Sequence, residues 1–151
     1  MNIAHPRLQA LYGFWQTKAS GERLPPRSAF LAEEFRPWMG HIAIADVEPD
    51  PLRFKFSLFG TVFVYVNNSD MTGRYVDEAM PEPIRAAILD DYTRCTESAA
   101  PLYVHRQSVN REWTSIHRLL LPCAENGDRV DKIIVGLYTE GGRTEFISDL
   151  P

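Results

Sequence analysis

The chain has 151 residues, of which 44% are hydrophobic and 24% are charged, and its formal net charge is −4 at pH 7. This length and composition are typical of a single globular domain with its own core. The acidic balance and the lack of a Lys/Arg-rich run argue against nucleic acid binding, and no apolar run approaches the roughly 20 residues of a membrane span.

We also expect a cytoplasmic protein with reduced thiols. The N-terminus lacks the apolar stretch of a secretory signal peptide, and the only two cysteines, Cys95 and Cys123, form no Cys-x-x-Cys motif. Disulfides are rare in the reducing environment of the cytosol, so neither thiol is expected to be bonded.

The first predicted element is an amphipathic helix over residues 5–18. Pro6 suits its first turn, where a backbone N–H is not needed. The apolar positions recur at helical spacing and are Leu8, Leu11, Tyr12 and Trp15. We divide the chain into this helix with its linker, residues 1–27, and a main part, residues 28–151.

The main part is expected to open with a short helix capped by Ser28 and closed by Pro37. Two strands follow, joined by a proline-rich turn. Residues 41–47 are small and apolar on both faces, which predicts an interior strand. Residues 53–59 alternate between apolar and polar side chains, which favours an edge strand with one wet face.

The pattern of residues 60–98 predicts a helical excursion, a set of helical segments between the second and third strands. Residues 62–66 favour either a short helix or more strand, because their apolar spacing is mixed. Residues 81–98 give the strongest helical pattern in the chain, with Cys95 on the apolar stripe and Asp91 as the one misfit on it.

Three further strands complete the pattern. Residues 101–109 predict a second edge strand, and residues 113–138 predict an antiparallel hairpin whose two apolar arms flank Asn126-Gly127. Both arms carry apolar side chains on both faces, so the hairpin should lie in the middle of the sheet. Pro122 has no N–H to donate and is expected to interrupt the regular ladder.

These elements together predict an α+β domain with a five-stranded antiparallel sheet. The helical excursion is expected to cover one face of the sheet. The N-terminal helix is expected to pack on the other face or on a partner subunit.

The order of these elements, together with a set of short motifs, resembles a PAS domain. The motifs are Trp15 with Gly21 and Leu24-Pro25, Arg53-Phe54-Lys55-Phe56, Phe59-Gly60-Thr61, Asp70-Met71-Thr72-Gly73-Arg74 with Asp77-Glu78, and Arg118-Leu119-Leu120-Leu121-Pro122. They are similar to a bacterial PAS-like family of short, stand-alone chains common in alphaproteobacteria, over about residues 11–137. The chain departs from that pattern at Asn68, where Gly is expected, and at His117, where an acidic residue is more usual.

The resemblance implies a non-catalytic sensory or regulatory module. PAS-like domains hold a small ligand or cofactor between sheet and helices, or bind a protein partner through the outer sheet face. The sequence identifies no particular cofactor. Signalling in trans is expected, because the chain carries no recognisable kinase, cyclase or DNA-binding segment, and a homodimer through the N-terminal helix is expected as well.

The candidate ligand-binding residues are aromatic or charged, and they are Phe56, Tyr65, Arg74, Tyr92, Tyr103, His117 and Arg118. The aromatic side chains are candidates for lining an apolar cavity, although core packing alone explains them. Arg74 is a candidate anchor for a carboxylate. We favour a structural interpretation in which Asp70 caps the next turn and Arg74 pairs with Asp77 or Glu78.

Arg118 is the most informative of these candidates. A cation among leucines needs a partner, since an unpaired buried charge is costly. Asp131 across the hairpin and a ligand anion are the two alternatives. The histidines at positions 41, 105 and 117 lack the spacing of metal or haem ligands, so ordinary, partly buried histidines are the favoured interpretation.

A different class of function stays open beside the sensory module. A small α+β enzyme with an apolar pocket could use Asp91 or His117 as its single buried base. The chain contains no nucleophile elbow, phosphate-binding glycine loop or His-Glu-x-x-His motif.

Overall fold

A computed structural model describes residues 1–21, 23–79, 84–107, 115–126 and 129–141. Its central element is a five-stranded antiparallel sheet of order β2-β1-β5-β4-β3. The strands are β1 (Ile42–Glu48), β2 (Arg53–Phe59), β3 (Leu102–Gln107), β4 (Ser115–Cys123) and β5 (Lys132–Glu140). The predicted α+β class is confirmed, as are the positions of β2 and β3 at the edges.

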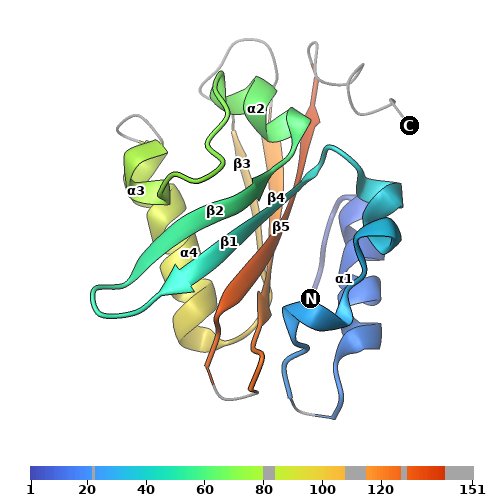
Figure 1. Cartoon of the computed structure of the whole chain (residues 1–151). Helices are drawn as coiled ribbons and strands as arrows, with labels where there is room; N and C mark the ends of the chain where they lie inside the picture. Colours follow the sequence, from blue (N-terminus) through green and yellow to red (C-terminus); the bar gives the residue numbers. More distant parts are fainter. Residues whose placement is uncertain (22, 80–83, 108–114, 127–128, 142–151) are drawn as a thin grey trace.

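Helices cover both faces of the sheet (Figure 1). On one face lie α2 (Thr61–Asn67), α3 (Val76–Ala79) and α4 (Ile84–Ser98), so the open choice at residues 62–66 is resolved as a helix. On the other face lies α1 (Pro6–Lys18), followed by the 3-10 helices η1 (Arg27–Ala29) and η2 (Ala32–Trp38). The strongest predicted helix is confirmed from residue 84 onward, and its first residues, 81–83, lie outside the described part.

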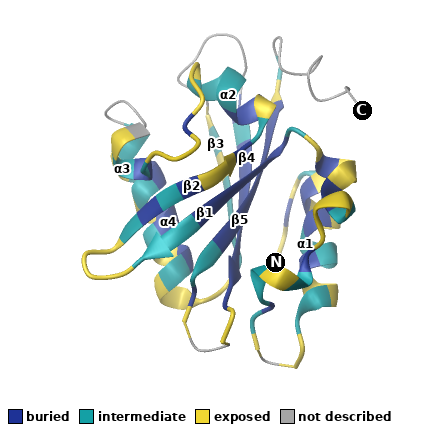
Figure 2. Cartoon of the chain, in the orientation of Figure 1, coloured by how far each residue is buried: buried dark blue, intermediate teal, exposed yellow. Residues whose placement is uncertain are grey.

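The sheet is buried on both sides, and Figure 2 shows β4 and β5 almost wholly in the buried class and β1 buried over its first part, Ile42 to Ala45. The core facing α4 includes Ala43, Phe54, Phe56, Tyr92, Leu120, Ile133 and Val135. The core facing α1 includes Leu8, Leu11, Trp15, Ile42, Ile44, Leu119, Leu121 and Ile134. Alternate residues of each inner strand therefore enter different cores, as the two-faced apolar pattern predicts.

Helix α1 packs directly on the backbone of β5. A Cβ atom at position 136 would lie 2.7 Å from Cδ2 of both Leu8 and Leu11, so Gly136 leaves the space that these two leucines occupy. The helix begins as predicted, with Pro6 in the first turn and the Nδ1 atom of His5 accepting from the Arg7 N–H at 3.2 Å. The N-terminal helix thus covers the sheet of its own chain.

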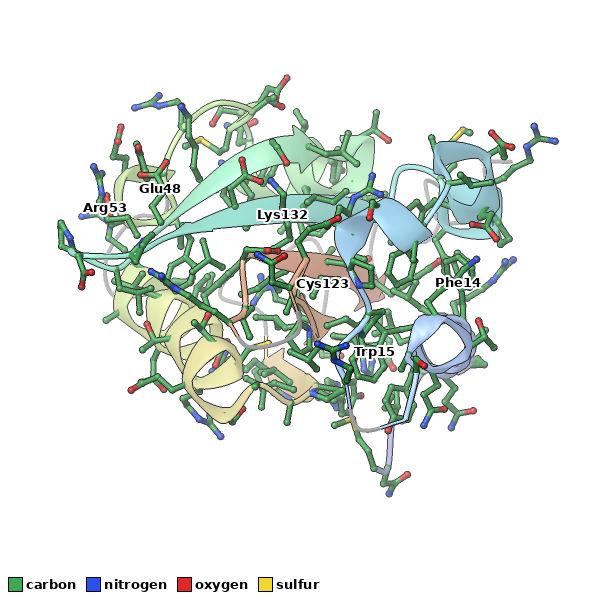
Figure 3. The ribbon with its side chains drawn as sticks, turned by 60° about the horizontal axis from the view of Figure 1, so that its bottom comes forward. Phe14, Trp15, Glu48, Arg53, Cys123 and Lys132 are labelled. Atoms are coloured by element: carbon green, nitrogen blue, oxygen red, sulfur yellow. The ribbon has the colours of Figure 1, made fainter. Side chains whose placement is uncertain are left out.

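Two aromatic residues of α1 fix its lateral position (Figure 3). The indole N–H of Trp15 donates to the Pro122 carbonyl at 3.0 Å, which ties the helix to the end of β4. Phe14 makes edge contacts with Phe30 and Phe35 at ring-centroid distances of 5.4 and 5.7 Å. The helix is therefore held on one side by the sheet and on the other by the 3-10 segments.

The expected interruption at Pro122 is wrong, because the pairing of β4 with β5 continues to Cys123. The Cys123 carbonyl accepts from the Asp131 N–H at 2.9 Å, so Cys123 points its polar backbone groups toward β5. Its neighbour Pro122 then points the opposite way, where its carbonyl bonds Trp15. Proline at this position costs no ladder bond, since its missing N–H would face away from β5.

The predicted alternation of β2 is wrong at its last residues. The β1–β2 register shifts between Ile44 and Ala45, because Leu58 pairs with Ile44 while Phe56 pairs with Ala45. Ser57 is the extra residue of this bulge, which reverses the phase of the strand. Leu58, expected inside with Phe54 and Phe56, is instead 45% exposed.

The single short helix expected between Ser28 and Pro37 is also wrong, since η1 and η2 replace it. Ser28 lies inside η1 and donates its hydroxyl to Glu125 at 2.8 Å, so it does not act as a backbone cap. Pro37 lies inside η2. The β4–β5 hairpin is confirmed, although Gly127 of its predicted turn lies outside the described residues.

An ion-pair network attaches α3 and the residues just before it to the turn end of the β1–β2 hairpin, where Glu48 and Arg53 lie (Figure 3). The guanidinium of Arg53 lies 3.6 Å from the ring centroid of Tyr75 and donates two hydrogen bonds to Asp77, at 2.8 and 2.9 Å. The Tyr75 hydroxyl donates to Glu48 at 2.8 Å. Charge and stacking therefore hold this segment against the edge strand β2.

The packing of α1 predicts a large cost for truncating its inner face. Leu11→Ala should lower the free energy of unfolding by about 2–5 kcal/mol, because Leu11 is almost fully buried against β5. Urea unfolding followed by circular dichroism measures it. Leu52→Ala, at a residue 40% exposed in the β1–β2 turn, is the matched control and should change stability far less. Equal losses in the two variants would contradict the packing described here.

Candidate functional site

A pocket of about 140 Å³ opens between α4 and the β3–β4 pair. Its lining is mostly apolar and comes from Ile84, Ala87, Ile88, Val104 and Ile116. Arg106, Gln107 and Arg118 add the polar groups. The antiparallel register explains this mixture, because Val104 pairs with Arg118 and Arg106 pairs with Ile116, so each strand contributes one arginine and one aliphatic residue to the face that α4 covers.

A buried carboxylate lies beside this pocket. Asp91, the misfit on the apolar stripe of α4, is 0% exposed. Both of its oxygens accept from the guanidinium of Arg106, through Nη1 to Oδ2 and through Nη2 to Oδ1, the latter at 2.8 Å. The Asp91 carboxylate raises the pKa of Arg106. The two hydrogen bonds from the guanidinium replace those that water would make with the carboxylate if it were exposed.

Arg118 is the second cation of the site, and no residue of the described part of the chain pairs with it in this way. It is only 7% exposed, and no residue in the described ranges makes a hydrogen bond or ion pair with its guanidinium. Burial lowers its pKa, while the nearby Tyr92 and Asp91 act in the opposite direction. An arginine stays protonated in proteins, so the group remains a cation.

The charges around the pocket do not cancel. Two guanidiniums, of Arg106 and Arg118, lie near one buried carboxylate, that of Asp91. Burial raises the pKa of the Tyr92 phenol, which therefore stays neutral. Among the buried groups of the described residues one positive charge is thus left uncompensated, while the exposed Asp90 also acts on Arg106. A buried charge without a partner is costly, and an anion bound in the pocket would remove that cost.

The structure separates the sequence-predicted site residues. Phe56 and Tyr92 share the α4 face with Arg118, but both are fully buried in the core and neither lines the pocket. Tyr65 lies on α2, half-buried and away from the lining residues. Tyr103 and His117 lie in or beside the core on the opposite, α1 face of the sheet.

Arg74 follows the structural interpretation. It lies 3.7 Å from Glu78 across one turn, and its side chain is 58% exposed. Asp70 accepts from the backbone N–H of Thr72 at 3.0 Å, and Gly73 has a φ of +82°, so the loop is stabilised by its own residues.

The proposed pairing of Arg118 with Asp131 is wrong. Asp131 lies before β5, at the turn end of the hairpin, and accepts from the Glu125 N–H at 2.9 Å. Arg118 lies further along the hairpin, opposite Leu137. The histidines were expected to be partly buried, but His41 and His117 are buried and His105 is exposed, and the β3–β4 register places His105 directly opposite His117.

Sequence reasoning missed Arg106 and the aliphatic lining of the pocket. The one available signal was Asp91, because an acidic residue on the apolar stripe of a helix requires a cation on the strand that the helix covers. Among the described residues no helix is long and apolar enough to cross a membrane.

Comparison with known proteins gives one match. The family model described as a PAS domain matches residues 3–139. None of the curated proteins matches the chain.

Replacing each of the two pocket arginines by methionine should change the stability of the protein in opposite directions. Arg118→Met should raise the free energy of unfolding of the ligand-free protein by about 1–3 kcal/mol, because it removes an unpaired buried charge. Arg106→Met should lower it by about 3 kcal/mol, because it leaves the Asp91 carboxylate buried without its fork. Chemical denaturation of both variants measures the difference. Destabilisation of similar size in both would show that Arg118 is already neutralised.

Proposed function

We propose that this chain, which belongs to the PAS domain family, is a non-catalytic sensor. Its ligand is a small apolar organic acid, bound in the pocket between α4 and the β3–β4 pair. PAS domains form a family of sensory and regulatory modules. The observation that carries the proposal is the guanidinium of Arg118, buried at the pocket without a partner among the described residues.

The chemistry of the pocket selects the class of ligand. A guanidinium fork binds a carboxylate through two parallel hydrogen bonds, which fixes its orientation. The remaining wall is mostly aliphatic, and this part of it would contact the apolar body of the ligand. A cavity of about 150 Å³ is known to hold benzene, so a pocket of about 140 Å³ suits an acid of the size of benzoate or a branched short-chain carboxylate.

The site offers little support for the alternative, a small enzyme with one buried base. Asp91 has both oxygens engaged by Arg106, and proton abstraction would require breaking that pair. His117 lies on the other face and has hydrogen-bond partners at both ring nitrogens. Neither group faces the pocket with a free lone pair. Binding without catalysis is therefore the function we favour.

We further propose that the protein acts in the cytoplasm, as a homodimer that passes its ligand state to a separate signalling protein. The two cysteines are unbonded, which agrees with a reducing compartment. The apolar residues of α1 face their own sheet, so we place the dimer contact beside the helix. There Met39, 61% exposed, and Leu58 line a shared apolar groove.

The ligand proposal predicts a preference for acids over neutral molecules of the same shape. Wild-type protein should bind benzoate, or another small apolar acid, at least about tenfold more tightly than its primary amide, because only the acid neutralises Arg118. Isothermal titration calorimetry measures both. Arg118→Met should abolish the preference.

A pair of neighbouring helix positions provides the steric control. Ala87→Phe should block binding, because Ala87 lines the pocket, whereas Ala86→Phe, on the exposed side of α4, should leave binding unchanged. Acid binding that survives both Arg118→Met and Ala87→Phe would refute this site.

The dimer proposal has its own test. Sedimentation equilibrium of the wild type at micromolar concentration should give twice the chain mass, and Met39→Lys should shift it to the chain mass, because a charge in an apolar contact must be desolvated. The exposed Leu52→Lys, in the β1–β2 turn, is the control and should remain dimeric. A monomeric wild type overturns the proposal without affecting the ligand site.

A further inference from the structure

Three potential metal ligands meet on the α1 face of the sheet, opposite the acid-binding pocket. His105 on β3, His117 on β4 and Glu140 on β5 each offer one donor atom, and these atoms lie within 4.8 Å of one another. The three strands are adjacent, and His105 and His117 are direct cross-strand partners. Their imidazole rings stack at a centroid distance of 3.9 Å.

His117 is the fixed member of this group. It is 1% exposed, and its Nδ1 atom lies 2.6 Å from the Tyr103 hydroxyl. Its Nε2 atom lies 2.5 Å from Oε1 of Glu140, so the ring presents this nitrogen toward the carboxylate. A hydrogen bond at one imidazole nitrogen fixes the ring and leaves the other nitrogen as the ligand, which is the usual arrangement around protein-bound metals.

Ring packing holds His117 from a further side. Tyr138 on β5 is its cross-strand partner, and His5, at the start of α1, stacks on Tyr138 at 4.4 Å and lies 5.3 Å from His117. The buried histidine is therefore enclosed by aromatic rings. The other two members, His105 and Glu140, are exposed at the surface of this face.

From this arrangement we infer that His105, His117 and Glu140 form a binding site for a zinc-type divalent metal ion. Two neutral imidazoles and one carboxylate are a ligand set that zinc accepts, with bonds of about 2.0–2.2 Å. Ligand atoms around a tetrahedral ion lie about 3.3 Å apart. The widest separation in the present group, up to 4.8 Å, must therefore close by about 1.5 Å, and the 2.5 Å between His117 Nε2 and Glu140 Oε1 must open by about 0.8 Å. Rotation of the exposed His105 and Glu140 supplies this, and the fourth position is left to water.

The ion would exchange the His117–Glu140 hydrogen bond for two metal bonds. With Nε2 on the metal, the proton of the neutral His117 ring resides on Nδ1 and is donated to the Tyr103 oxygen. Tyr103 is thus a positioning residue. The two cysteines do not compete for the ion, because both are buried and burial raises the pKa of each thiol to about 12.

Titration of tag-free protein with zinc chloride, followed by isothermal calorimetry, tests the site. Wild type should bind one zinc ion per chain. Tyr103→Phe should weaken zinc binding by about tenfold, because it removes the hydrogen bond that orients His117. His105→Ala and Glu140→Gln each remove a metal ligand and should weaken it by roughly 100-fold or more. Each changes a side chain at or near the surface of this face.

The matched control is His5→Asn, which removes the neighbouring imidazole outside the donor set and keeps a side chain that can cap α1. It should bind zinc like the wild type. Substitution of cobalt(II) should give absorption bands that disappear in His105→Ala. No zinc binding by the wild type, or equal weakening in His5→Asn and His105→Ala, overturns the inference. Neither result affects the pocket at Arg118, which lies on the other face.

Discussion

The constraint on which this fold depends is a sheet that is apolar on both faces. Strands β1, β4 and β5 carry buried side chains in alternate directions, so neither face is stable in water. Helix α1 covers one face and the α2–α4 excursion covers the other. The absence of a side chain at Gly136 lets α1 approach closely enough to bury Leu8 and Leu11 completely.

The two helical layers bury different polar groups against the sheet. The core under α1 is filled mainly by aromatic and aliphatic side chains, and the buried His117 lies on the same face. The core under α4 contains Asp91, a carboxylate that must be neutralised because the helix buries it completely. Arg106 does so from the neighbouring edge strand. Arg118 then remains as an additional cation, which is why the pocket suits an anion.

The central and edge strands could be told apart from the sequence because side-chain polarity reports how many faces of a strand are buried. Residues 41–47 and the hairpin arms are apolar on both faces, whereas β2 alternates, and this contrast separates centre from edge. The bulge at Ser57 and the proline inside β4 could not be predicted, since both depend on which backbone groups face a neighbour. The candidate sites depend on register between distant strands. For that reason Arg118 was identified from its apolar surroundings, while its relation to Arg106 and that of His105 to His117 were not.

Both sites belong to the same pair of strands, and strand geometry explains how. His117 and Arg118 are consecutive on β4, so their side chains point to opposite faces. Their partners on β3, His105 and Val104, are consecutive as well. Strand β3 is an edge strand, hydrogen-bonded within the sheet to β4.

A one-residue slip of β3 along β4 would exchange the two faces of β3. Aliphatic side chains would then lie among the histidines, and His105 would lie beneath α4. The ion pair between Arg106 and the fully buried Asp91 opposes such a slip, because it fixes β3 to α4. The electrostatic bond on one face therefore maintains the histidine geometry on the other.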